Sequence, residues 1–170
     1  MSEDAALPPP GADGTVLVRL RLSPPVRALV QGLIERVHAA LDVRRQHPLD
    51  EVPGAMPVDE DLLAPWLEGL REGTTHDTRA LLALLSRKGF GAEDIPLPAE
   101  EAEGVMRACV RVRLHLADTL LRDLKLAEVT GAKQIMRLSL AEQHGYACYR
   151  LLVHLEHDLL LQLDPSLPSY

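Results

Sequence analysis

The chain has 170 residues, of which 46% are hydrophobic and 25% are charged, and its formal net charge at neutral pH is −7. Such a length and composition are typical of one globular domain, and an acidic chain without a run of Lys and Arg argues against nucleic acid as a partner. No apolar run approaches the roughly 18 residues of a membrane span, and the acidic opening MSEDAALPPPGADG differs from the basic start of a signal peptide, so we expect a cytoplasmic protein.

Aromatic residues make up only 3% of the chain. The core must therefore consist of Leu, Val and Ala, which suits packed helices better than a β-sandwich. We predict a mostly α fold, with five helices in one bundle-like domain over residues 15–164 and a small β element at its N-terminus. Residues 1–14 are predicted to be a disordered tail, and residues 165–170 a frayed one.

The segment TVLVRLRL, residues 15–22, alternates apolar and polar side chains and predicts a strand with Val16 and Val18 on its buried face. Three partners are open to this strand: residues 95–97, residues 135–138, or the same strand of a second subunit. An unpaired strand would be a sticky edge.

Ser23 and the following prolines open an amphipathic helix that runs to about Val43. A Pro-rich loop is expected over residues 46–58. A short helix over residues 59–72 then ends at Gly73, and Thr74 and Asp77 have a spacing similar to a capping box for the next helix, over residues 74–88.

The two longest apolar patterns predict helices over residues 98–125 and from Ser139 to about Leu163, while residues 126–138 are ambiguous. Each long helix carries a charge on its apolar face, Arg113 in the first and Glu156 in the second. Arg113 and Glu156 lie at comparable distances along their helices from the connection that joins the two. If the helices are antiparallel neighbours, Arg113 and Glu156 should meet, with the Tyr149 hydroxyl nearby.

Three interpretations of Arg113 are open. The favoured one is a buried ion pair with Glu156 that fixes the register of the two helices. The second is a polar pocket for an anion or a small molecule, with a catalytic role as an option, centred on Arg113, Glu156 and Tyr149. In the third, Arg113 extends to the surface and pairs with nothing.

Other chemistry finds little support in the sequence. His115, His154 and His157 lack the spacing of a zinc site and project off the apolar faces, so no metal is expected. Cys109 and Cys148 fall on predicted core faces, where free thiols behave as small hydrophobes. No phosphate-binding loop, GxSxG or CxxC motif is present, so we assign no catalytic residue and no cofactor.

Two features indicate interaction with another protein. The last helix is apolar nearly all round at its end, where Leu159, Leu160, Leu161 and Leu163 need to be covered. The strand residues Val16 and Val18 need a partner as well, and the loop over residues 48–58 offers a further contact surface. A homodimer is the simplest arrangement that covers these surfaces.

The order of the pieces resembles a bacterial family known only as a domain of unknown function, encoded near the adaptor of the Clp protease. The resemblance lies in the VRLRL strand, the leading helix, the RVRLHL segment from Arg111 to Leu116 and the closing YRLLVHLEHDLL helix, and it spans residues 15–163. The Pro-rich loop 48–58 and the connection 126–138 depart from the pattern. The resemblance implies a cytoplasmic regulatory or adaptor role, which agrees with a non-enzymatic interaction module.

Overall fold

The structure of the chain is a computed structural model that describes residues 15–45, 60–129, 131–164 and 166. The predicted tail 1–14, the predicted loop 46–58 and most of the predicted tail 165–170 lie outside the described residues.

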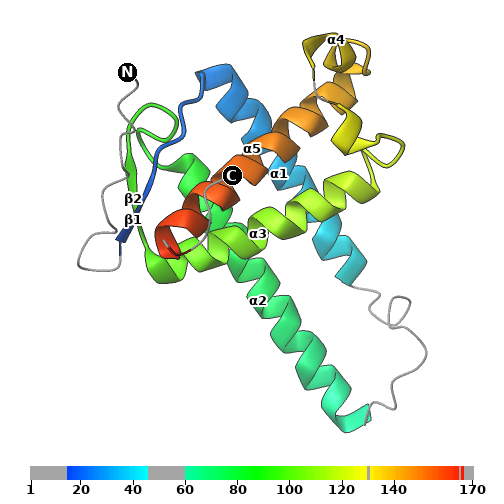
Figure 1. Cartoon of the computed structure of the whole chain (residues 1–170). Coiled ribbons are helices and arrows are strands. Elements are labelled where there is room, and N and C mark those ends of the chain that lie inside the picture. The colour runs from blue at the N-terminus through cyan, green and yellow to red at the C-terminus, as the bar shows by residue number, and fades with distance from the viewer. Residues whose placement is uncertain (1–14, 46–59, 130, 165, 167–170) are drawn as a thin grey trace.

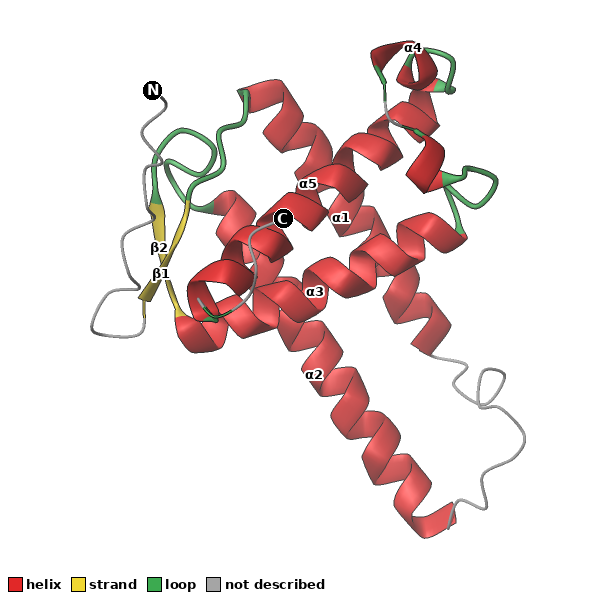
Figure 2. Ribbon diagram, in the orientation of Figure 1, coloured by secondary structure: helices red, strands yellow, loops and turns green. Residues whose placement is uncertain are grey.

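The described residues form a mostly helical fold with a small two-stranded sheet, which confirms the predicted fold class (Figures 1 and 2). In chain order the elements are β1 (Thr15–Val18), α1 (Pro24–Arg45), α2 (Glu60–Ser86), β2 (Ile95–Pro98), α3 (Ala99–Asp118), a 3₁₀ turn η2 (Leu126–Glu128), α4 (Ala132–Ile135) and α5 (Leu140–Leu163). None of the described helices is long and apolar enough to cross a membrane.

The strand β1 pairs with β2 of the same chain in antiparallel register, Val16 opposite Leu97 and Val18 opposite Ile95. These four side chains are buried, so they close one face of the core. The first of the three candidate partners is therefore the observed one, whereas Ile135 belongs to α4. The strand ends at Val18 and is shorter than predicted, although the backbone N–H of Leu22 still donates to the Gly91 carbonyl (2.8 Å) in the same register.

The outer edge of β1 is covered by the end of α5. The Gln162 amide donates to the Leu17 carbonyl and accepts from the Leu17 N–H, both at 2.8 Å. One turn earlier, the Asp158 carboxylate accepts the backbone N–H of Arg19, and burial raises the pKa of this carboxyl. Two side chains of a helix thus supply the bonds that a third strand would make.

The predicted break at Gly73 is wrong, because α2 is one continuous helix from Glu60 to Ser86. Thr74 and Asp77 do not form a cap: both are buried, and the Thr78 hydroxyl donates to the Thr74 carbonyl one turn back (3.0 Å). A single glycine costs a helix interior only about 1 kcal/mol, which packing against α3 outweighs.

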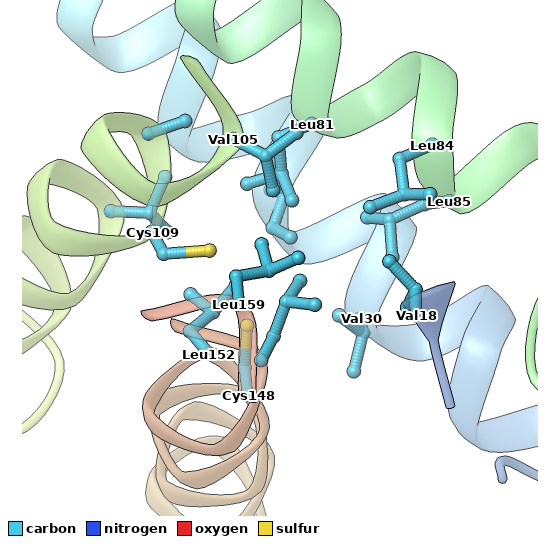
Figure 3. Close-up of a cluster of buried hydrophobic side chains, with 14 of the residues drawn as sticks. Val18, Val30, Leu81, Leu84, Leu85, Val105, Cys109, Cys148, Leu152 and Leu159 are labelled. Atoms are coloured by element: carbon cyan, nitrogen blue, oxygen red, sulfur yellow. The ribbon is translucent and has the colours of Figure 1, made fainter. Parts of the chain in front are cut away.

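The core lies where α1, α2, α3 and α5 meet beneath the sheet, and it is aliphatic as predicted (Figure 3). The close-up shows Cys109 of α3 and Cys148 of α5 with their sulfur atoms directed into this cluster. Both thiols are free and buried. Burial raises the pKa of Cys148 to about 12 and raises that of Cys109 further, so neither is an available thiolate near neutral pH.

The helix α3 ends at Asp118, seven residues before the predicted end at Lys125. The Thr119 hydroxyl donates to the His115 carbonyl (2.6 Å), and the Leu121 N–H bonds to the Leu116 carbonyl (2.9 Å). This turn is widened, because its last bond spans five residues, and Leu121 lies buried in the core. In the ambiguous range 126–138, the described residues form the short η2 and α4.

Candidate functional site

The helices α3 and α5 lie side by side and antiparallel (Figure 1). At one end of their contact, Gly145 of α5 lies against Leu120 and Leu121, where an added Cβ would approach the Leu120 side chain to 2.6 Å. Farther along, Glu156 meets Arg113. Gly145 thus allows the close approach that brings the two charged residues within reach of each other.

The structure brings together the three residues that the sequence singled out. An Nη atom of Arg113 lies 2.6 Å from an Oε atom of Glu156, and the guanidinium carbon lies 5.7 Å from the centre of the Tyr149 ring. Tyr149 therefore offers Arg113 the face of its ring, within cation–π range. The contact predicted between Arg113 and Glu156 is present.

The ion pair is shielded without being fully buried. The Arg113 and Glu156 side chains are 22% and 25% exposed. Both charges act on the nearby thiol of Cys109, Glu156 raising its pKa and Arg113 lowering it, after the larger effect of burial. Within the described part of the chain, Arg113 Nε is buried and has no hydrogen-bond acceptor.

This geometry favours a structural role for the pair. Glu156 neutralises the positive charge of Arg113, so the ion pair has no net charge that would attract an anion. A bond between residues in the C-terminal parts of two long helices fixes how the helices slide past each other. The interpretation in which Arg113 pairs with nothing is wrong.

The predicted interaction surface is largely wrong. Val16, Val18 and Leu159 are buried within the chain, because β2 pairs with β1 and the core covers the inner side of α5. Leu161 and Leu163 are partly buried, and Leu163 packs against the core. Of the predicted surface residues, Leu160 remains a large exposed apolar side chain, at 40%.

Two apolar residues of α3 are exposed, Val110 at 36% and Leu114 at 61%. Val110 precedes Arg113 by about one turn, and Leu160 follows Glu156 by one turn. Because the helices are antiparallel and Arg113 bonds to Glu156, helical spacing places Val110 and Leu160 toward the same side of the helix pair. We call Val110, Leu114 and Leu160 the α3–α5 patch.

A second ion pair, between Asp77 and Arg107, did not follow from the sequence pattern. Asp77 is 4% exposed, and Arg107 of α3 donates to both of its oxygens at 3.0 Å. This bidentate bond raises the pKa of Arg107. Gly104 makes room for it, since a Cβ there would lie 3.2 Å from the carboxylate. The one available signal was the acidic residue on an otherwise apolar face of α2.

The histidines that we considered as metal ligands do not converge on a site. His154 and His157 are exposed on α5. Among the described residues, no group of three or more His, Cys, Asp or Glu side chains is close enough to hold a metal ion.

Comparisons with known proteins do not assign this chain to a family. No protein family, no curated protein and no solved structure matches it.

Proposed function

We propose that this chain is a non-enzymatic protein-interaction module that forms a homodimer through the α3–α5 patch. The observation that carries the proposal is the exposure of Val110, Leu114 and Leu160, each at least 36%, on two helices that contact each other. Large apolar side chains that gather on a surface favour contact with another protein.

A second copy of the chain suits this surface. If α3 packs antiparallel against α3 of another copy, Val110 of each lies beside Leu114 of the other. The same arrangement brings the exposed Glu103, near the start of one α3, close to Arg122, just past the end of the other. A symmetric pair thus matches apolar residues at its centre and opposite charges at its ends.

The wider role that we propose is a cytoplasmic regulatory or adaptor-like one. Support comes from the resemblance described above and from two cysteines that are free and buried, as is usual in a reducing compartment. The alternative of a ligand pocket at Arg113, Glu156 and Tyr149 is less favoured, because Arg113 and Glu156 neutralise each other's charge.

The test is the mass of the protein in solution. Multi-angle light scattering over about 1–100 µM should give a dimer for the natural sequence and a monomer for Leu114→Glu. Leu140→Glu is the matched control, because Leu140 is also a large exposed apolar residue, at 67%, outside the patch. It should remain dimeric.

A natural sequence that is monomeric at about 100 µM would refute the dimer. A dimer that survives Leu114→Glu, or that is lost in Leu140→Glu, would refute the patch as its interface. Circular dichroism of each variant establishes that the helices are intact.

A further inference from the structure

The connection between α3 and α5 is longer than the fold requires. Neighbouring antiparallel helices are commonly joined by about 2–8 residues, yet here residues 119–139 intervene. The described part of this connection lies near the starting end of α5, in the yellow region of Figure 1. Long connections within small domains often carry a function.

Two hydrogen bonds hold this connection against α5. The Tyr146 hydroxyl donates to the Val129 carbonyl (2.6 Å), and the Gln143 amide donates to the Leu138 carbonyl (2.8 Å). The Tyr146 hydroxyl hydrogen and one of the two Gln143 amide hydrogens are therefore occupied by the protein itself. The connection is held at a fixed place on the helix.

A pocket of about 550 Å³ lies between the connection and α5. Its outer wall includes Leu126, Val129 and Ile135, and its inner wall includes Tyr146 and Arg150. This volume is within the range of small-molecule sites, about 300–1,000 Å³. An apolar wall with one charged group at its side selects a molecule with an apolar body and one charge.

Arg150 supplies that charge. It is exposed, and within the described part of the chain no carboxylate forms an ion pair with it. A single guanidinium neutralises one negative charge and can bind a carboxylate through two parallel hydrogen bonds.

We propose that this pocket binds a small apolar carboxylate, such as a medium-chain fatty acid, with the carboxylate on Arg150 and the hydrocarbon against Leu126, Val129 and Ile135. The site is separate from the α3–α5 patch. Its occupancy therefore does not depend on whether the chain forms a dimer.

Isothermal titration calorimetry with decanoate, below its micelle-forming concentration, tests the proposal. Decanoate should bind the natural sequence saturably with one molecule per chain. Decanol and decylamine, which have the same chain length, should bind more weakly, since neither offers Arg150 a negative charge.

Variants separate the two parts of the site. Arg150→Gln should weaken decanoate binding at least about tenfold, because it removes a charge-assisted hydrogen bond. Ala147→Trp places a large side chain at the pocket wall and should abolish binding of decanoate and decanol alike. Arg137→Gln removes an exposed arginine that is not part of the lining and should change nothing.

Three results would overturn the proposal: no saturable decanoate binding, equal binding by Arg150→Gln, or decylamine binding as tightly as decanoate. Circular dichroism of Ala147→Trp distinguishes a filled pocket from a damaged fold, and Arg150→Gln provides an independent test if that variant fails to fold.

Discussion

The bond between Arg113 and Glu156 should be worth more than an ordinary surface ion pair, and this can be measured with Arg113→Met, Glu156→Leu and the double variant. Each single change leaves one charge in the contact between α3 and α5 without its counter-charge. The double change removes both charges and leaves two apolar side chains of suitable length.

The magnitude follows from the exposure of the two side chains. Exposed pairs contribute about 0.2–1 kcal/mol, whereas removing one partner of a fully buried pair costs about 3–5 kcal/mol. Arg113 and Glu156 are 22% and 25% exposed, so they lie between these cases. We expect each single change to lower the free energy of unfolding by about 2 kcal/mol, which for a chain of this size lowers Tm by about 4–8 °C.

Urea unfolding followed by circular dichroism gives the four free energies of a double-mutant cycle. The expected coupling between Arg113 and Glu156 is about 1.5 kcal/mol. The matched control is the pair Arg87–Glu101, which has the same 2.6 Å separation but side chains 35% and 47% exposed. Its coupling should stay below about 1 kcal/mol.

Unaltered Tm values for both single variants would refute a stabilising role for the ion pair. A coupling of Arg113 with Glu156 that is no larger than the coupling of Arg87 with Glu101 would refute this role as well. In either case the pair would follow from helix packing that other contacts determine, and it would not fix the register.

Two further predictions concern backbone and thiol chemistry. Gly73→Ala should raise the free energy of unfolding by about 0.5–1 kcal/mol, because Gly73 is inside α2 and an added Cβ meets nothing within 4 Å. Gly91→Ala should lower it by about 1–3 kcal/mol, because Gly91 has φ +83° and its Cβ would lie 3.2 Å from the Leu22 carbonyl oxygen. Thermal melts check both variants, and a lower Tm for Gly73→Ala would contradict a continuous α2. Burial raises the pKa of Cys109 and Cys148 from 9.0. Above about pH 9 the unfolded chain therefore binds fewer protons than the folded chain, and the free energy of unfolding should fall as pH rises. The fall should reach up to about 1.4 kcal/mol per pH unit for each thiol. Between pH 8 and 10, urea melts should show that the free energy of unfolding falls less steeply with pH in Cys148→Ala than in the natural sequence. Equal slopes in the two proteins would contradict a raised pKa for Cys148.

Some of the fold could be predicted because the sequence pattern is local and regular. A charge that interrupts an apolar face is visible in one chain, and Arg113 and Glu156 interrupt two faces at comparable depth. The strand at Val16 and Val18 was visible for the same reason, through strict alternation of apolar and polar side chains.

What could not be predicted depends on contacts between distant segments. Asp77 has the spacing of a cap, and only the position of Arg107 on a neighbouring helix shows that it is half of an ion pair. Val110 and Leu114 belong to an apolar arc that is wider than the contact with α5, and the pattern does not say which edge of the arc stays exposed. The pocket beside Arg150 is formed partly by a connection without periodicity, so no pattern indicates it.

The bonds from Gln162 and Asp158 to β1 have a consequence for the order of folding during synthesis. Leu17 and Gln162 are 145 residues apart, so at about 5–20 residues per second the ribosome adds Gln162 roughly 7–30 s after Leu17. The ladder with β2 can form earlier, but one edge of β1 stays open to other chains throughout this interval. Closure of that edge, by two side chains one helical turn apart, should therefore be among the last steps of folding.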